Sequence, residues 1–266
     1  MSQAEIGVFG GSGFYRWLED VEQVTVGTPY GPPSDAIAIG RLGTRRIAFL
    51  PRHGASHQVP APAVNYRANV FAMRELGVRR LLGPCAVGSL RQEVRPGDLV
   101  ICDQFVDRTS GRKDTYYPSG PEVVHVSSAD PYCPQLRGLA AEAASSAGLR
   151  FQPSGTVVVI QGPRFSTRAE SRWFSGMGWD VVGMTQYPEA ILARELEMCY
   201  ATLALVTDYD VGLEGQPDVK AVEAADVMRV LAENVTRVQD LLRRLIPAIP
   251  DQPSCRCQQA LAGAKL

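Results

Sequence analysis

The sequence has no apolar run approaching 18 residues, no basic segment followed by an apolar one at its start, and no surplus of charge of either sign. A membrane-spanning helix needs about 20 consecutive apolar residues, and a secretory leader needs a basic and then an apolar stretch. The formal net charge is −1, and Lys and Arg cluster only in short pairs such as Arg45-Arg46. We therefore expect a cytoplasmic protein that binds neither membranes nor nucleic acid.

Histidine is scarce as well, with three residues in the chain. His53 and His57 lie within five positions of each other, yet no nearby Cys, Asp or Glu completes a set of zinc ligands. We therefore expect no metal site there.

The six cysteines show no spacing typical of a metal site. Four of them lie far apart in apolar or mixed surroundings and are expected to be thiols of the core, namely Cys85, Cys102, Cys133 and Cys199. Cys255 and Cys257 stand in a polar tail that follows several prolines, and a single Cys-x-Cys pair is too sparse for a zinc site on its own. In a reducing cytoplasm the pair would be two exposed free thiols.

The chain contains no repeat or low-complexity segment, and short β-branched runs alternate with amphipathic stretches. This pattern predicts an α/β fold, in which one mixed β-sheet in a single domain is flanked by helices. We assign the domain to residues 1–250 and a C-terminal tail to residues 251–266. Strands are expected at 6–9, 36–42, 45–50, 80–82, 98–105, 156–160, 181–184 and 200–207. Helices are expected at 65–76, 166–177, 188–197 and 221–245, and Pro247, Pro250 and Pro253 then end regular structure.

Two glycine-containing loops follow expected strands. Gly10-Gly11-Ser12-Gly13 lets backbone N–H groups converge on an anion, although neither a dinucleotide fingerprint nor a P-loop lysine is present. The small residues Ala86 to Gly88 permit close approach of a ligand to the backbone. For both loops the alternative is an ordinary tight turn.

Arg52 and His53 come directly after another expected strand. An arginine offers a planar fork that suits phosphate, and a histidine adds a donor. The alternative is a surface loop.

Two further segments carry groups that suit an aromatic ligand. Phe165 can stack on a base and the hydroxyl of Ser166 can orient it, although core packing is the alternative for Phe165. Asp208 and Asp210 end an apolar run, and their spacing places both carboxylates on one side of a strand. Such a pair has its pKa values driven apart unless it meets donors, which suits one acceptor and one proton donor. A solvated turn or a helix cap is the alternative.

Taken in order, these segments resemble the methylthioadenosine phosphorylases of the trimeric purine nucleoside phosphorylase superfamily, from Ile6 to about Ile249. Each motif is unspecific by itself, whereas the ordered set is specific. The matching segments are Gly10 to Gly13, Arg52 to Gly54, Asn65 to Asn69, Asp107 to Thr109, Gly162 to Ser171, Met184-Thr185 with Pro188-Glu189, and Thr207 to Asp210.

The resemblance implies a homotrimer that needs no metal or organic cofactor, with inorganic phosphate as a co-substrate. It implies phosphate binding by Ser12, Arg52, His53, Cys85, Ala86 and Thr185. It implies nucleoside binding by Phe165, Ser166, Met184, Asp208, Tyr209, Asp210, His57, Val227 and Met228, and by His125 from the neighbouring subunit. It also indicates a disulfide between Cys255 and Cys257, which is the alternative to free thiols. The sequence departs from the family at Cys85, where many relatives carry a polar residue, and at Gly183, where Asn is common.

The implied reaction is phosphorolysis of S-methyl-5′-thioadenosine to adenine and 5-methylthioribose 1-phosphate, in purine and methionine salvage. Asp210 would protonate purine N7, and Asp208 would accept from the 6-amino group. Because a 6-oxo group would leave that carboxylate unpaired, we expect a 6-aminopurine substrate. Alternatives are a phosphorylase for methylthioinosine or other 6-oxopurine nucleosides, a nucleoside hydrolase, and a non-catalytic nucleoside-binding protein.

Overall fold

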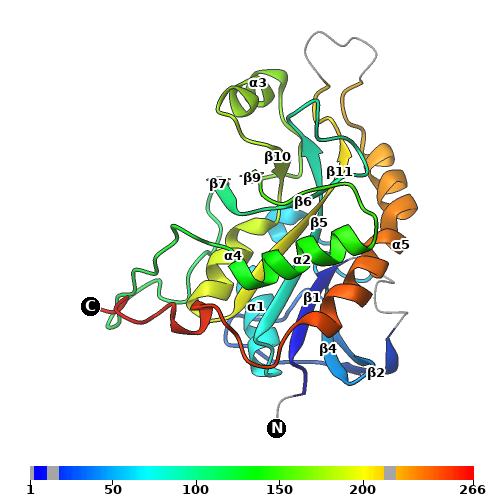
Figure 1. Cartoon of the computed structure of the whole chain (residues 1–266). Coiled ribbons are helices and arrows are strands. Elements are labelled where there is room, and N and C mark those ends of the chain that lie inside the picture. The colour runs from blue at the N-terminus through cyan, green and yellow to red at the C-terminus, as the bar shows by residue number, and fades with distance from the viewer. Residues whose placement is uncertain (1–2, 11–17, 213–219) are drawn as a thin grey trace.

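The computed structural model describes residues 3–10, 18–212 and 220–266 (Figure 1). The strands in this part of the chain are β1 (Ile6–Gly10), β2 (Glu19–Val24), β3 (Ile37–Leu42), β4 (Arg45–Pro51), β5 (Arg80–Ser89), β6 (Leu99–Ile101), β7 (Gln104–Arg108), β8 (Phe151–Gln152), β9 (Thr156–Ile160), β10 (Val181–Gly183) and β11 (Cys199–Asp208). The helices are α1 (Tyr66–Glu75), α2 (Pro134–Ser146), α3 (Arg168–Gly176), α4 (Gln186–Glu195) and α5 (Ala224–Ala248), with short 3-10 turns at Ala61–Ala63 and Cys257–Gln259.

The strands form one mixed sheet that branches at β5. β1, β4, β3 and β2 lie on one side of β5, and β11 lies on the other side and leads through β6 to β8. β10, β9 and β7 continue from the carboxyl end of β5. β1 is parallel to β4 and β5, and β11 is parallel to β5. The carboxyl ends of these four strands therefore meet at one edge, where ligands bind in sheets of this kind.

Helices cover both faces of the sheet. α1 and α4 bury Val70, Met73 and Leu192 in one core cluster, and α2 and α5 bury Leu136 and Leu241 in a second. A fully buried side chain of this size contributes about 1.5–3 kcal/mol to stability. Because the sheet is packed on both faces, the edge that carries the strand ends is held rigidly. Only α3 stands apart from the two layers, at the far end of the molecule beside β10 (Figure 1).

The α/β prediction is confirmed, as are the hairpin of β3 and β4 and helices α1, α3, α4 and α5. The helix expected at 188–197 is the regular part of α4, because Tyr187 has non-helical backbone angles. The helix expected from residue 166 begins at Arg168, where Thr167 and Glu170 form a reciprocal capping box.

Several expectations about secondary structure were wrong, and strands β2 and β8 were not predicted. Residues 98–105 form two strands that pair with different neighbours, β6 with β11 and β7 with β9. α5 continues through Pro247 to Ala248, so that proline lies within its last turn. Helix α2 was missed, because its alanine-rich sequence gives little amphipathic contrast; Cys133 caps it and a proline opens it.

The C-terminal tail packs against the domain and ends beside residues 122–126. Cys257 and Ala264 are buried. The backbone N–H of His125 donates to the carbonyl of Ala264 at 2.8 Å, and Val124 forms a β-bridge with Lys265. In Figure 1 the red end of the chain lies next to this green loop. The tail is therefore part of the fold and braces the 122–126 segment.

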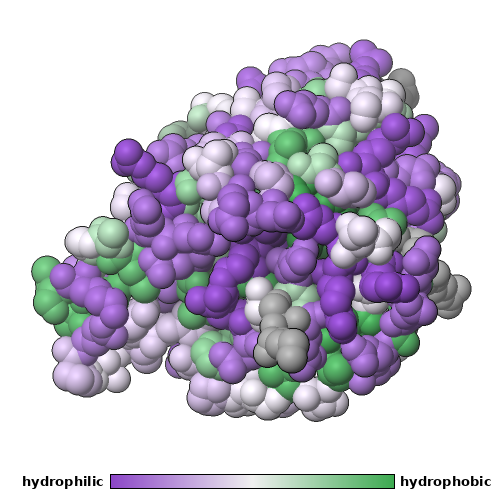
Figure 2. Space-filling view, turned by 60° about the horizontal axis from the view of Figure 1, so that its bottom comes forward, coloured by the Kyte–Doolittle hydropathy of each residue, from purple (hydrophilic) through white to green (hydrophobic). Residues whose placement is uncertain are grey.

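One face of the molecule offers few large apolar areas (Figure 2). On the face drawn in Figure 2, hydrophobic residues form small patches separated by hydrophilic ones. Among the helices of the described residues, none has both the length and the apolar character needed to cross a membrane.

Candidate active site

The edge where the parallel strands end collects most of the residues singled out from the sequence. Gly10, the last residue of β1, pairs with Pro51 of β4, and its carbonyl accepts from the N–H of Arg52 at 3.1 Å. Ala86 of β5 pairs with Leu205 of β11, and Gly88 pairs with Asp208. Ser12 follows β1 but lies outside the described residues, so its predicted role stays a prediction.

Arg52 is buried at the end of β4, with 3% of its surface exposed. Its Nε and Nη2 donate to the two carboxylate oxygens of Glu189, the second at 2.9 Å, and its Nη1 donates to the carbonyl of Pro84 at 3.1 Å. Burial lowers the pKa of Arg52, but the Glu189 carboxylate outweighs burial and raises it above its ordinary value. The guanidinium therefore stays charged. An arginine has five N–H donors, and these three bonds leave two for a ligand.

Glu189 holds this arginine in place from α4. Its side chain is fully buried and also accepts a hydrogen bond from Tyr200 at 2.7 Å. A buried carboxylate persists only where charge and hydrogen bonds compensate it. Glu189 belongs to a matched segment, but no sequence pattern indicated that it pairs with Arg52, because the two residues are 137 positions apart.

Replacing Glu189 with Gln is expected to lower the free energy of unfolding by about 3–5 kcal/mol, because the charge of Arg52 would stay buried without its counter-ion. Urea denaturation measures this loss. Glu22→Gln is the matched control, since it breaks an exposed pair with Arg46 and should cost about 1 kcal/mol or less. Similar losses in both variants would contradict a compensating role for Glu189.

His53 is neutral, and its accessible nitrogen is an acceptor. Its Nδ1 lies 2.9 Å from the carbonyl of Val59 and must carry the proton, because a carbonyl only accepts. Burial, with Arg52 adding to it, lowers the pKa of His53 to about 4. In the neutral ring Nε2 accepts, and the predicted role of His53 as a donor to phosphate stays a prediction. His57 lies beside it, with ring centroids 4.6 Å apart, but is exposed.

The start of α4 faces the same strand ends. Thr185 is buried at the capping position, yet its side chain makes no capping bond, so its hydroxyl is available to a ligand. Gln186 donates to the sulfur of Cys85 at 2.6 Å. Burial raises the pKa of the Cys85 thiol to about 12, so it stays neutral and does not repel an anion. An anion at this edge would therefore meet the backbone of Cys85 and Ala86 and a neutral thiol.

The two carboxylates do not project from one continuous strand, as the sequence spacing had predicted. β11 ends at Asp208, and Asp210 has a left-handed backbone with φ of 47°. Asp208 accepts from the backbone N–H of Asp210 and from the hydroxyl of Thr207, each at 2.7 Å. The chain therefore turns back on itself. A Cβ added to Gly88 would lie 2.9 Å from Asp208 Oδ1 and 3.2 Å from Asp210 Cα, so only glycine fits against the pair.

Burial raises the pKa of both carboxyl groups. The pKa of Asp208 rises to about 6, although the bonds from Thr207 and the Asp210 backbone oppose the rise. The pKa of Asp210 is also raised by burial, against the effect of the nearby hydroxyls of Ser171 and Ser166. Asp210 is 2% exposed, and its Oδ2 has no hydrogen-bond partner among the described residues. Asp208 thus has both oxygens engaged as acceptors, whereas Oδ2 of Asp210 accepts no hydrogen bond from the described residues.

Residues 162–171 bring aromatic and hydroxyl groups to the carboxylate pair. Arg168, at the start of α3, donates to the carbonyl of Val211 at 3.0 Å and joins this segment to the end of β11. The hydroxyl of Ser166 is buried without a partner in the part of the chain that the structure describes. Phe165 is 36% exposed, so core packing does not account for its ring. Tyr209 is half-buried, and its hydroxyl reaches the carbonyl of Gln92 at 3.5 Å.

The chain just before α5 is joined to the turn that follows β11. Val222, just before α5, donates its N–H to the carbonyl of Asp210 at 2.7 Å. Val227 is half-buried and Met228 is 52% exposed, so a single chain does not enclose them. The sulfur of Met184 would lie 2.6 Å from a Cβ added to Gly162, which shows how closely these segments pack.

Sequence reasoning missed Arg112, which supports the Met184 backbone. Its Nη1 donates to the carbonyls of Met184, at 2.8 Å, and of Tyr187, and its guanidinium lies over the ring of Tyr66 at 5.2 Å. No spacing signal could have revealed this residue, because its partners are more than 40 positions away in the sequence.

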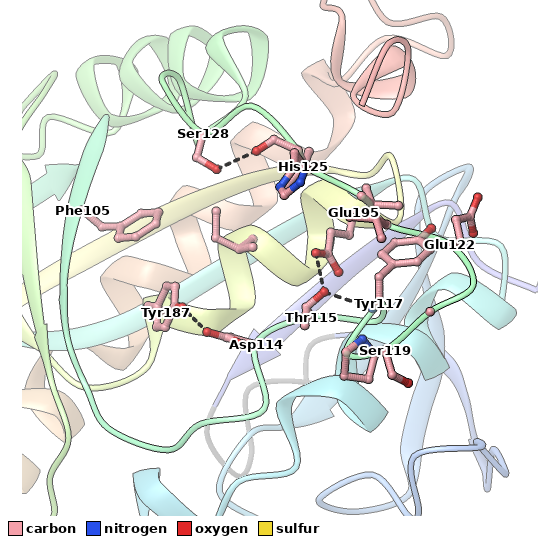
Figure 3. A pocket seen from close by; sticks show the side chains of 16 residues that line it. Phe105, Asp114, Thr115, Tyr117, Ser119, Glu122, His125, Ser128, Tyr187 and Glu195 are labelled. Atoms are coloured by element: carbon pink, nitrogen blue, oxygen red, sulfur yellow. Dashed lines mark hydrogen bonds between the residues drawn. The ribbon is translucent and has the colours of Figure 1, made fainter. Parts of the chain in front are cut away.

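His125 lies in a separate pocket of about 640 Å³ (Figure 3). Thr115 donates to Glu195 at 2.8 Å there, and Tyr187 donates to Asp114 at 2.5 Å. None of the residues that line this pocket is one of the predicted phosphate ligands or the paired carboxylates. His125 is exposed and does not join the site of its own chain.

The cysteines correct another expectation. Cys85 and Cys102 are separate thiols, as expected, but Cys133 and Cys199 are not scattered. Together with Cys255 and Cys257 they form one cluster, whose four sulfur atoms all lie within 4.8 Å of one another. All six cysteines are free thiols.

The family model of the phosphorylase superfamily matches residues 5–247 of this chain. The chain is 53% identical to a purine nucleoside phosphorylase of Streptomyces coelicolor, over 98% of this chain and 95% of that protein. It is 54% identical to an S-methyl-5′-thioadenosine phosphorylase of Mycobacterium tuberculosis, over 98% and 96% of the two chains. The solved structure of a methylthioadenosine phosphorylase from Schistosoma mansoni in complex with adenine superposes with a TM-score of 0.91 at 34% identity, over 98% of each chain.

Proposed function

The chain belongs to the phosphorylase superfamily, and from this premise we propose that it converts S-methyl-5′-thioadenosine and inorganic phosphate into adenine and 5-methylthioribose 1-phosphate. The observation that carries the proposal is that a charged, buried arginine and two carboxyl groups, the half-buried Asp208 and the buried Asp210, lie beside different points along the single strand β5. The carbonyl of Pro84 accepts from Arg52, and Gly88 lies against Asp208. Four residues of strand span about 13 Å, which leaves room for a sugar between an anion and a base.

The phosphate would lie between Arg52 and the start of α4. The two free N–H donors of Arg52, the hydroxyl of Thr185 and the backbone of Cys85 and Ala86 support this assignment, and the family resemblance adds Ser12. The acceptor nitrogen of His53 suits the remaining hydroxyl of monohydrogen phosphate. Such fixed donors orient the phosphate oxygen for attack instead of leaving it to solvent.

In the reaction, a phosphate oxygen forms a bond to the anomeric carbon while the bond from that carbon to purine N9 breaks. The electron pair of the broken bond passes to the base, so N7 must gain a proton as the base leaves. Asp210 supplies that proton in this proposal, because it is buried with an oxygen free to carry it. Asp208 stays ionised and accepts from the 6-amino group, and the proton lost from Asp210 is restored from solvent after the products leave.

The rest of the pocket would hold the nucleoside. Phe165 stacks on the base, Ser166 and Tyr209 line its edge, and Met184 lies along the ribose. Val227 and Met228 would cover the 5′-methylthio group, with His57 nearby. These roles follow the resemblance, and the exposure of Phe165 and Met228 supports them, because both side chains are left for a ligand or a neighbouring chain to cover.

The proposal includes a homotrimer in the cytoplasm that uses no metal or organic cofactor in the reaction. His125 would then complete the 5′ end of a neighbour's site. Its exposure and its separation from the strand-end site of its own chain support that assignment.

The deciding experiment measures release of free base from methylthioadenosine, adenosine, methylthioinosine and inosine, with and without phosphate. We expect release only with phosphate and fastest from methylthioadenosine. Release without phosphate would instead indicate a hydrolase, and tight binding without product would indicate a binding protein. Comparable rates on methylthioinosine would favour the 6-oxopurine alternative.

A further inference from the structure

Three distant parts of the chain bring four cysteines together on the face of the sheet away from α1 and α4. Cys133 caps the amino end of α2, Cys199 is the first residue of β11, and Cys255 and Cys257 come from the tail. Three of these side chains are buried and that of Cys255 is half-buried. The proposed phosphorolysis uses none of them.

The spacing of the sulfur atoms matches a tetrathiolate site. All four lie within 4.8 Å of one another, and Cys199 and Cys255 are 3.4 Å apart. Zinc binds thiolates at about 2.3 Å, which puts the sulfurs of a tetrahedral site about 3.8 Å apart. A disulfide requires about 2.05 Å, and no pair here is bonded. The cluster therefore needs only small side-chain adjustments to surround one ion.

One ligand of the cluster lies at the start of a helix. The N–H of Leu136 donates to the sulfur of Cys133 at 3.5 Å, so one ligand receives the partial positive charge of a helix start. Four thiolates around a divalent ion leave a net charge of −2. Arg80 pairs with Cys199 in the register of the neighbouring strand, is buried, and has Nε and Nη2 without hydrogen-bond partners in the described part of the chain. The positive charge of Arg80 would partly neutralise the negative charge of the zinc site.

We propose that Cys133, Cys199, Cys255 and Cys257 bind one structural zinc ion, which fastens the C-terminal tail to α2 and β11. A closed set of four protein ligands leaves no position for substrate, as in structural zinc sites. Binding releases the thiol protons and transfers no electrons. Formation of two disulfides would instead require an oxidant that accepts four electrons.

The test is zinc analysis of the full chain, purified under reducing conditions and incubated with zinc chloride before gel filtration. We expect about one zinc per chain. Cobalt should replace it and give the absorption bands of tetrahedral cobalt thiolate. Cys257→Ser should retain at least about tenfold less zinc, whereas Cys102→Ala, which removes a buried thiol outside the cluster, should retain all of it.

A second measurement uses the unaltered protein in case the cysteine variants do not fold. Removing the metal with a strong chelator should expose four additional reactive thiols and lower the midpoint of thermal unfolding. Absence of zinc and cobalt binding by the reduced protein would overturn the proposal. So would peptide mapping that finds the four cysteines joined as disulfides in metal-free, folded protein as isolated.

Discussion

Replacing Asp210 with Asn should lower kcat for phosphorolysis of methylthioadenosine by about 10²–10⁴-fold, the usual contribution of a general acid. An asparagine keeps the size of the side chain and a hydrogen bond to N7, but it has no proton to transfer as the base departs. The buried position of Asp210 and its free Oδ2 are the observations behind this expectation. Initial rates at saturating phosphate measure the effect.

The matched control for this variant is Asp240→Asn, which removes an exposed carboxylate on α5 that pairs with Arg243. It should leave kcat unchanged. A further check is the nature of the leaving group: a nucleoside whose base departs without protonation should be cleaved almost as well by the Asp210 variant as by the unaltered protein. A near-normal kcat on methylthioadenosine would refute the role of Asp210 as proton donor.

Asp208→Asn should reverse part of the preference between 6-amino- and 6-oxopurines. In the unaltered protein a 6-oxo group would face a carboxylate, and each unpaired buried group costs about 1–3 kcal/mol. Sites built on such pairing discriminate by about 10⁴-fold. An amide can donate to the 6-oxo group, so we expect the ratio of kcat/KM for methylthioadenosine over methylthioinosine to fall by at least about 10²-fold. An unchanged ratio would exclude Asp208 from the contact with position 6.

The pH dependence gives the same residue a second test. The pKa of Asp208 is about 6, above the ordinary value of an aspartate, so the group is ionised above that pH and protonated below it. A protonated carboxyl loses acceptor capacity, and kcat/KM for methylthioadenosine should therefore fall as the pH drops through 6. In Asp208→Asn this limb should disappear, while changes that come from the titration of phosphate should remain.

The strand ends of the site were predictable because the local signals were strong. Arg52 and Asp208 each end an apolar strand, and parallel strands deliver such residues to a common edge. The chemistry of the same residues was less predictable, because it depends on partners distant in the chain. Glu189 determines how much of Arg52 remains free, and the carbonyl of Val59 determines which nitrogen of His53 can accept.

The carboxylate pair and the cysteine cluster show two different limits of sequence reasoning. Spacing of two residues places side chains on one face only while the strand continues, and here the left-handed backbone at Asp210 ends it. Cys133 and Cys255 are 122 positions apart, so only the tertiary fold reveals that they meet. Composition and spacing predict local geometry well, but they do not predict which distant segments of the chain come together in the fold.

The bridge between Val124 and Lys265 has a genetic consequence. A premature stop codon just before Ala264 would preserve every residue of the proposed chemistry and the whole family-matched segment, yet it would remove both the acceptor of the His125 N–H and the partner of Val124. In the proposed trimer that histidine serves the adjoining subunit. When the truncated polypeptide is co-expressed with the intact one, it would therefore impair the site of the neighbouring subunit more than its own. The truncation would then be dominant-negative rather than a simple loss of function.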